Sequence, residues 1–437
     1  MTEQERALAL TEELIDFISD SPVSYWVIRN AVDRLEADGY ERLDPQHLNL
    51  KRGGRFYLTL NGSTLIAFRL PTKDPNGFMV TAAHSDSPLF KLKPNFAVKA
   101  CDRYMKLNTE VYGGSIYSSW FDRPLSIAGR VVVREGDALA VRHVRLDEDL
   151  CLIPNVCIHF NREINNGYKY NPAVDTLPLI GNWTDEPVLM QRIADAVGAK
   201  AEDVVSGDLF LYNHLHGTVF GLDKAFFAAP RIDDQQCAFA ALKGFLASED
   251  GDSVPVMAIF DNEEVGSTTK QGAASDFLRD ALKHIAALYG IQLSGLLPTS
   301  MLLSADNAHA MHPNHPELSD AQNAPHMNGG IVIKHNARQR YATDAVSEAL
   351  FLEICKKAQV PVQHFTNRSD VAGGWTLGGI ASARVSMNTA DIGLAQLAMH
   401  SACETAGVMD TAYLVDAFRV FFASSIHCDS DGVYRLL

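Results

Sequence analysis

The chain has 437 residues, of which 47% are hydrophobic and 21% charged, and 38 Lys and Arg against 53 Asp and Glu give a net charge of −15. This composition is that of a globular protein and excludes collagen, coiled-coil and disordered chains, and the length allows two or three domains. The negative charge also disfavours nucleic acid and anionic membrane surfaces as partners.

Cysteine usage and the first residues indicate the compartment. The seven cysteines are scattered and form no CxxC pair, which argues against a zinc finger, a thioredoxin-like motif and a disulfide scaffold. The segment MTEQERALALTEEL is polar and acidic, unlike a signal peptide. No apolar run approaches the roughly 18 residues that a membrane helix needs. We therefore expect a soluble, cytoplasmic protein.

The first 92 residues predict two helices and then strands. Apolar residues at helical spacing favour helices over 3–21 and about 23–35. The Asn61-Gly62 dipeptide lies between β-rich runs and predicts a hairpin over 55–70. A buried strand is expected to follow over 77–86.

The middle of the chain differs from its two flanks. From about 93 to 224, short β-type runs alternate with turns, and 159–172 has almost no helical periodicity. After Pro230, apolar strands at 254–260, 298–306 and 360–367 alternate with helices at 275–290, 343–358 and 410–425. This alternation predicts a sheet covered by helices. We expect one α/β domain over 1–92 and 225–437, interrupted by an inserted β-rich domain over 93–224.

Five segments place possible metal ligands where an apolar strand ends. They are AAHSDSP (His84, Asp86), PRIDDQQ (Asp233, Asp234), IFDNEEVGS (Asp261, Glu263, Glu264), LLSADNAHAMHPN (Asp306, His309, His312) and AMHSACE (His400, Glu404). Functional groups of open α/β sheets gather at the carboxyl ends of strands, so these segments could converge in one crevice.

Single residues in these segments allow two interpretations. His84 and Asp86 are two apart on an extended segment, so the carboxylate could orient the imidazole, or the pair could form a polar turn. Of the adjacent acids, one could bind a metal while the other acts as general base, or both could lie in a solvated loop. His400 alone would more often be a core residue than a ligand.

The histidines of the fourth segment are also ambiguous. His309, His312 and His315 could be further ligands, or the His- and Pro-rich stretch could be a surface connection.

Taken together, the segments favour a metallohydrolase. Two histidines and three or four acids form the mixed N/O shell of Zn²⁺, or of Mn²⁺ and Co²⁺. Two metals about 3.5–4 Å apart that share a carboxylate are a known hydrolytic device. The chain has no GxSxG elbow, no GxxxxGK[ST] loop and no GxGxxG after a strand, so serine-hydrolase, phosphate-loop and dinucleotide chemistry lack support.

The segments HSDSP, RIDDQ, DNEEVGS, SADNAHAMHPN, KHNARQRYAT and MHSACETAG, in this order, resemble the M18 metallopeptidases, the aspartyl aminopeptidase family. The resemblance covers nearly the whole chain, includes IHFNREINNG in the middle region, and is strongest to the bacterial branch. It implies a zinc-exopeptidase fold, a sheet sandwiched by helices, with the insertion serving dimerisation. It also implies a homo-oligomer, a tetrahedral dodecamer, that acts on peptides.

The resemblance implies a role for each metal ligand, with two Zn²⁺ per subunit. His84 and Asp306 would hold one ion, Glu264 and His400 the other, and Asp233 would bridge them. The eukaryotic pattern at the bridge is Arg-x-Asp-Asn, whereas this chain has Asp233-Asp234, and we choose Asp233 by register.

Further residues receive catalytic roles from the resemblance. Glu263 would be the general base, Asp86 would orient His84, and His159 would reach the active site of a neighbouring subunit. Hydroxide formed at the metals would attack the first peptide carbonyl, and Glu263 would pass its proton to the leaving amine.

Specificity is assigned to the segment IVIKHNARQRYAT. The resemblance selects Lys334 and Tyr341 as the contacts of an acidic N-terminal side chain, and we add His309 as a substrate-binding residue. Without the family resemblance, we would interpret this segment as a solvated basic loop. We expect removal of N-terminal Asp or Glu. The two rival classes are a dinuclear-metal amidohydrolase of small N-acyl compounds and a non-enzymatic metal-containing assembly protein.

Overall fold

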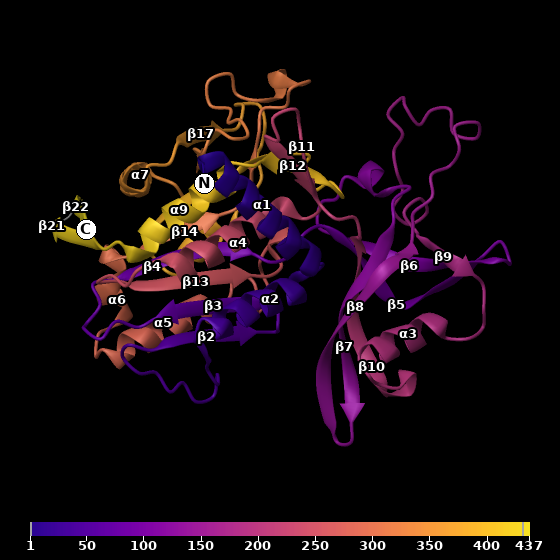
Figure 1. Ribbon diagram of the computed structural model, residues 1–437, viewed down its shortest axis with the longest axis horizontal. Helices are drawn as coiled ribbons and strands as arrows, with labels where there is room; N and C mark the ends of the chain where they lie inside the picture. Colours follow the sequence, from indigo (N-terminus) through magenta and orange to yellow (C-terminus); the bar gives the residue numbers. More distant parts are fainter. Residues whose placement is uncertain (1, 431) are drawn as a thin grey trace.

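The computed structural model describes residues 2–430 and 432–437. Its largest sheet has nine strands in the order β1-β2-β3-β13-β4-β14-β18-β16-β17 (Figure 1). These strands are β1 (Glu41–Arg42), β2 (Arg55–Leu60), β3 (Thr64–Arg69), β4 (Phe78–His84), β13 (Val254–Phe260), β14 (Met301–Ala305), β16 (Ile331–His335), β17 (Val362–Thr366) and β18 (Asn388–Gly393).

Helices cover both faces of this sheet. One face packs against α2 (Ser24–Ala37), α4 (Ile232–Ala247), α7 (Ala345–Ala358) and α9 (Asp410–Ala423). The other packs against α5 (Phe277–Leu288), α6 (Leu293–Leu296) and α8 (Leu377–Ser382). On β4, Met79 joins the first core and Val80 the second, which explains why central strands are unbroken apolar runs in the sequence. The predicted α/β sandwich is confirmed.

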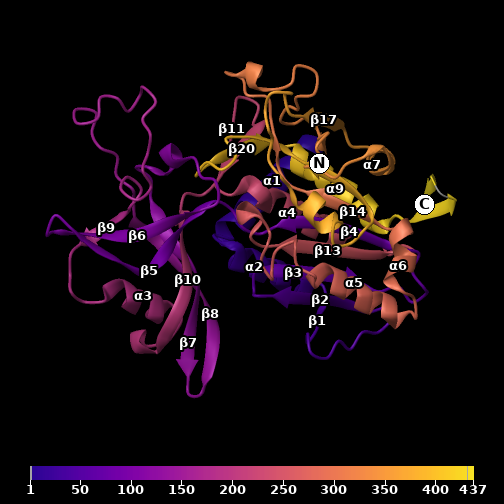
Figure 2. The same ribbon diagram turned by 180° about the vertical axis from the view of Figure 1, so that it is seen from behind.

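A second sheet forms a separate body beside the first (Figures 1 and 2). Its order is β8-β7-β10-β5-β6-β9, and its pairs are antiparallel. The elements are β5 (Leu89–Ala100), β6 (Tyr104–Tyr112), β7 (Leu125–Glu135), β8 (Ala138–Cys151), β9 (Leu179–Asn182), β10 (Val204–Asn213) and α3 (Val188–Ala196). Phe90, Trp120 and Ile127 belong to its own hydrophobic core.

A third sheet has five strands in the order β11-β12-β20-β19-β15. It comprises β11 (Thr218–Phe220), β12 (Phe226–Ala229), β15 (Ala308–His309), β19 (Ala395–Leu397) and β20 (Glu404–Gly407). The boundary that we placed after residue 224 falls between β11 and β12, which pair with each other. The division of the chain at 93 and 224 therefore stays a proposal.

The chain ends lie on the larger body. α1 (Glu3–Asp20) packs against β12 and α4, and the closing hairpin is β21 (Ile426–Ser430) with β22 (Val433–Leu436).

Short 3₁₀ turns are η1 (Tyr117–Trp120), η2 (Ala201–Asp203), η3 (Glu263–Val265), η4 (Leu297–Thr299) and η5 (Pro316–Leu318). Within residues 2–430 and 432–437, the helices are all too short or too polar to span a bilayer.

Candidate metal centre

Three neighbouring parallel strands of the nine-stranded sheet end at the site. β13, β4 and β14 lie side by side, and Phe260, the last residue of β13, is paired with His84, the last residue of β4. The carboxyl ends of these strands therefore bring together His84, the turn η3 that begins with Glu263, and Asp306, as the topology of such sheets leads one to expect.

The third sheet supplies the two remaining ligands. Asp233 follows β12 at the start of α4, where its backbone is not helical. His400 lies in the loop between β19 and β20, with a left-handed backbone (φ 68°). A buried Glu404 carboxylate accepts the main-chain N–H of His400 at 2.7 Å and that of Asp233 at 3.0 Å. The Glu404 carboxylate thus holds the backbones of both ligand segments in place.

The candidate ligands form two groups that share Asp233. In the first group, His84 Nε2 lies 3.4 Å from Asp233 Oδ1 and 3.8 Å from Asp306 Oδ1. In the second, His400 Nε2 lies 3.5 Å from Asp233 Oδ2 and 3.3 Å from Glu264 Oε2. The two oxygens of Asp233 therefore face different histidines, as a bridging carboxylate requires.

Asp234 occupies a different position from its neighbour. Its Oδ2 accepts the main-chain N–H of His84 at 3.1 Å, and it belongs to the first group alone. Asp234 therefore supports the strand end that holds His84, and it does not span the two groups.

Each histidine has its second ring nitrogen directed at a carbonyl. His84 Nδ1 lies 3.0 Å from the main-chain oxygen of Asp86, and His400 Nδ1 lies 3.1 Å from that of Gly114. A ring N–H bonded to a carbonyl leaves Nε2 with its lone pair free, which is the tautomer that binds metal.

Asp86 contacts several groups besides His84. Its carboxylate is 3.4 Å from His84 Nδ1, but its hydrogen bonds come from the main-chain N–H groups of Glu263 and Glu264, each at 3.1 Å, and from Tyr112 Oη at 2.7 Å. The main-chain carbonyl rather than the carboxylate is the nearer partner of the imidazole. Asp86 therefore couples the His84 segment to the two acids.

The charges of the site suit bound cations. Burial, with the nearby Asp233, raises the pKa of Glu264 well above its usual range. Burial would lower the pKa of His400, yet Asp233 and Glu264 raise it to about 10. Among the described residues, buried Asp233 Oδ1 and Glu264 Oε1 have no hydrogen-bond partner. Cations between these groups would satisfy the orphaned oxygens, so the donor set fits metal ions.

Glu263 differs from the ligands. It lines the same cavity, of about 630 Å³, but belongs to neither ligand group. Burial, opposed by His84 and reinforced by Asp306, raises its pKa to about 8. A carboxylate with a pKa near neutrality beside the ligands is suited to accept and return a proton.

The predicted specificity residues also line this cavity. Lys334 is buried at the end of β16; its Nζ donates to the main-chain oxygen of Asn307 at 2.8 Å and lies 3.5 Å from Asp306 Oδ2. Its ammonium lies 5.6 Å from the ring centroid of Tyr341. His309 lines the cavity too, with its ring edge-on to Phe365.

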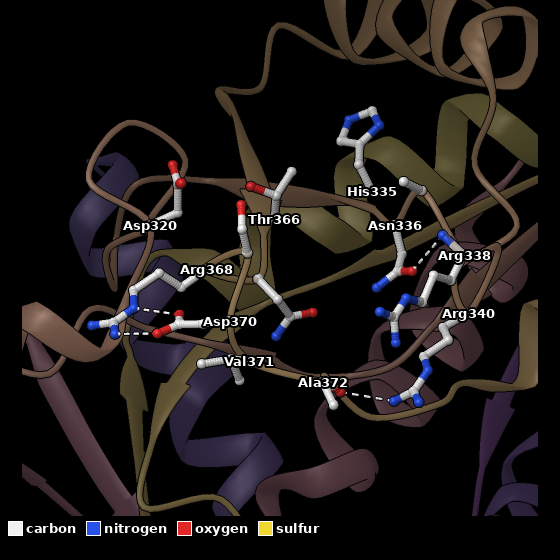
Figure 3. Close-up of a pocket in the computed structure, with 13 residues that line it drawn as sticks. Asp320, His335, Asn336, Arg338, Arg340, Thr366, Arg368, Asp370, Val371 and Ala372 are labelled. Carbon is white, nitrogen blue, oxygen red and sulfur yellow. Dashed lines mark hydrogen bonds and ion pairs between the residues drawn. The ribbon is translucent and has the colours of Figure 1, made fainter.

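The other basic residues of this segment face elsewhere. Arg338 and Arg340 line a separate cavity of about 450 Å³ with Arg368 (Figure 3). The guanidinium of Arg340 stacks on Trp375, and this Trp lines the metal-centre cavity. β16 ends at His335, and the turn that follows it thus carries the two arginines away from Lys334.

Some predicted residues lie outside the cavity. His159 is exposed in the turn-rich stretch between β8 and β9 of the second sheet, and His312 and His315 are on a loop with their rings 5.4 Å apart. Asp261 is buried but lines a different cavity, next to Tyr25 and Arg130. The interpretation of the His- and Pro-rich stretch as a connection therefore fits His312 and His315.

Comparison with known proteins shows the family of the chain. Residues 17–422 match the family model described as aminopeptidase I zinc metalloprotease (M18). The chain belongs to the M18 family. It is thus a metal-dependent aminopeptidase, and the family match selects the peptidase among the three classes that the sequence left open.

Relatives of this M18 chain span its length. It is 41% identical over 427 residues to a "Probable M18 family aminopeptidase 2" of Clostridium acetobutylicum, which covers 95% of the chain and 99% of the relative. It is 34% identical over 480 residues to a "Probable aspartyl aminopeptidase" of Ricinus communis, with 98% of each covered.

Solved structures share the fold of this M18 chain. A chain of the solved complex of Ape4 and Nbr1 superposes with a TM-score of 0.92 at 33% identity, over 97% of this chain and 86% of that one. A chain of the S. cerevisiae mApe1 dodecamer gives 0.83 at 27% identity, over 94% and 96%.

Proposed function

We propose that this M18 aminopeptidase works with two metal ions per subunit, Zn²⁺ or in its place Mn²⁺ or Co²⁺, and removes acidic N-terminal residues from peptides. The observation that supports two ions is the shared position of Asp233. Its oxygens lie 3.4 and 3.5 Å from the Nε2 atoms of His84 and His400, so a single carboxylate can serve both ligand groups.

The proposed ligand sets follow the two groups. His84 and Asp306 would hold one ion, and Glu264 and His400 the other, with Asp233 between them. When bound, such ions supply an activated water and polarise the scissile carbonyl. The chain supplies a rigid frame for this chemistry, because Asp86 and Glu404 hold the ligand backbones in place.

Glu263 is the proposed general base. It would accept the proton of the attacking water and return it to the leaving amine. The hydrogen bond from its main-chain N–H to Asp86 keeps η3 fixed, while its side chain remains free to face the cavity.

Substrate choice is proposed to rest on Lys334 and Tyr341, with His309 at the wall of the cavity. Burial opposes the charge of Lys334, but Asp306 and Tyr341 hold the pKa of this ammonium above its usual value. A permanent cation in a buried cavity favours an acidic side chain at the substrate N-terminus. The relative described as a probable aspartyl aminopeptidase agrees with this preference.

Assembly is the third part of the proposal. The mApe1 neighbour from S. cerevisiae is a dodecamer, and we propose a homo-oligomer of this kind for this chain, with His159 reaching an adjacent subunit. His159 lies in an exposed stretch together with Ile158 and Phe160, which are 50% and 89% exposed. Apolar side chains of this exposure favour contact with another protein surface.

The deciding experiment is Glu263→Gln. We expect the variant to hold the same number of metal ions as the parent, while hydrolysis of peptides falls about 10²–10⁴-fold, as for loss of a general base. Metal analysis and steady-state rates measure both quantities. Turnover near the parent rate would show that Glu263 is not the base, and loss of metal would show that it is a ligand.

A further inference from the structure

A second cluster of metal-type side chains lies away from the catalytic centre. His335 is the last residue of β16, His364 lies on β17, and Glu348 lies on α7. β17 is the edge strand of the nine-stranded sheet. Figure 3 shows the imidazole of His335 pointing away from Arg338 and Arg340.

The sheet register explains why these side chains meet. β16 and β17 are parallel, with Ile333 paired to His364, so His335 lies diagonally across from His364 on the same face. Ile333 packs in the core formed with α7, and this face therefore looks toward α7 and Glu348. Lys334, between the two positions, points to the opposite face and the catalytic cavity.

The three ligand atoms form a nearly equilateral triangle. His335 Nε2 lies 3.3 Å from His364 Nδ1 and 3.5 Å from Glu348 Oε1, and His364 Nδ1 lies 3.3 Å from Glu348 Oε1. Ligands about 2.0–2.1 Å from a tetrahedral Zn²⁺ are separated from one another by about 3.4 Å. The triangle has the dimensions of one face of such a tetrahedron.

The three ligand atoms surround one point. In the tautomers that leave His335 Nε2 and His364 Nδ1 without a hydrogen, both nitrogen lone pairs are available beside the Glu348 oxygen. The neutral imidazole is the form that binds metal. A divalent cation would satisfy all three atoms together.

We propose that His335, Glu348 and His364 form an additional divalent-metal site, of the Zn²⁺ type, that joins β16 and β17 to α7. Two histidines and one carboxylate are a recognised zinc ligand set, with the fourth position open to water. The side chains of His335, Glu348 and His364 are 28%, 24% and 46% exposed, so ions reach the site from solvent. The site is separate from the catalytic groups.

The test compares metal content in full-length variants. Parent, His364→Ala and Glu348→Gln proteins are stripped with a chelator, reloaded with Zn²⁺, freed of excess metal and analysed for metal per subunit. We expect each variant to hold one ion fewer than the parent and to keep the parent kcat/KM in zinc-containing buffer. His315→Ala is the matched control, because His315 pairs with Glu317 at 3.1 Å but belongs to none of the ligand groups among the described residues.

Reloading with Co²⁺ gives a second readout. The visible absorption of the parent should exceed that of His364→Ala by the intense bands of one four-coordinate ion. Equal metal content in parent, His364→Ala and Glu348→Gln would overturn the proposal, even if one variant folded poorly. The metal count that remains in His364→Ala tests the catalytic pair independently, since two ions are expected there.

Discussion

The phenol of Tyr112 donates a 2.7 Å hydrogen bond to the carboxylate of Asp86. Tyr112 ends β6 of the second sheet, and Asp86 follows β4 of the first, so this bond joins the two bodies directly behind the metal centre. Burial and the charge of Asp86 raise the pKa of Tyr112 far above its usual value, so the phenol remains a donor throughout the working pH range. Its oxygen also accepts from Asn262 Nδ2 at 2.8 Å.

Tyr112→Phe should therefore slow catalysis without removing metal. Asp86 keeps its bonds to the main chain of Glu263 and Glu264 but loses one partner, and loss of such outer contacts costs about 10–100-fold in activity. Tyr25→Phe is the control, since its hydroxyl bonds Asp208 at 3.3 Å, outside the metal centre. Parent rates in Tyr112→Phe, or equal losses in both variants, would contradict this prediction.

Asp233→Ala and Asp234→Asn should separate the two adjacent acids. Without the Asp233 carboxylate, two cations would face each other unscreened, and we expect at least one to leave and activity to be lost. Asp234→Asn retains an oxygen for the main-chain N–H of His84 and should keep its metals. Metal analysis of both variants shows which of the two acids is the bridging ligand. Full metal content in Asp233→Ala together with a loss in Asp234→Asn would assign the bridge to Asp234.

The metal-free protein should lose stability as pH rises. His400 has a pKa raised to about 10 in the fold against about 6.5 in an unfolded chain. Its contribution to folding stability is complete below about pH 6.5 and disappears as pH passes through 10. The raised pKa of Glu264 acts with the same sign.

Thermal unfolding from pH 7 to 10 measures this effect. The Tm of the chelated protein should fall over this range, while that of the metal-loaded protein changes less, because its ligands are already deprotonated. His400→Ala should flatten the profile of the chelated protein, and His315→Ala should not. Parallel profiles with and without metal would refute the assignment.

Much of this site was predictable from local patterns. The apolar strands ending in His84, in the Glu263-Glu264 pair and in Asp306 could be found from the sequence, and the parallel topology explains why their ends meet. The contacts that hold the site together could not. Tyr112 and Gly114 come from the second sheet and the loop that follows it, and their approach depends on how two bodies pack, which no residue spacing encodes. The diagonal pairing of His335 and His364 depends on which strands of one sheet are neighbours and in what register, which the sequence around each histidine does not encode either.

His159 should act in trans if the proposed assembly is correct. His159→Ala and Glu263→Gln should each be nearly inactive alone, yet their co-expressed mixture should regain activity. A site with an intact Glu263 can then receive His159 from a neighbouring subunit. Mixing Glu263→Gln with Asp233→Ala is the control, since both changes affect the same site and cannot complement. Activity of the first mixture no higher than the mean of its components would exclude action across an interface.

Lys334→Met should weaken the preference for acidic N-termini. Lys334 donates to Asn307 and lies 3.5 Å from Asp306, so part of its ammonium remains available to a substrate carboxylate. A charged hydrogen bond contributes about 1.5–3 kcal/mol, which corresponds to roughly 10- to 150-fold in selectivity. The measurement is kcat/KM for Asp-Ala, Glu-Ala and Leu-Ala. Lys334→Met also takes a partner from Asp306 and can lower activity toward every substrate. The ratio of kcat/KM for Asp-Ala to that for Leu-Ala, taken within one variant, is not affected by such a general loss. Arg338→Met is the matched control, because Arg338 belongs to the same segment but lines the other cavity. A parent that prefers Leu-Ala, or an unchanged ratio in Lys334→Met, would contradict the acidic pocket and leave the metallopeptidase assignment intact.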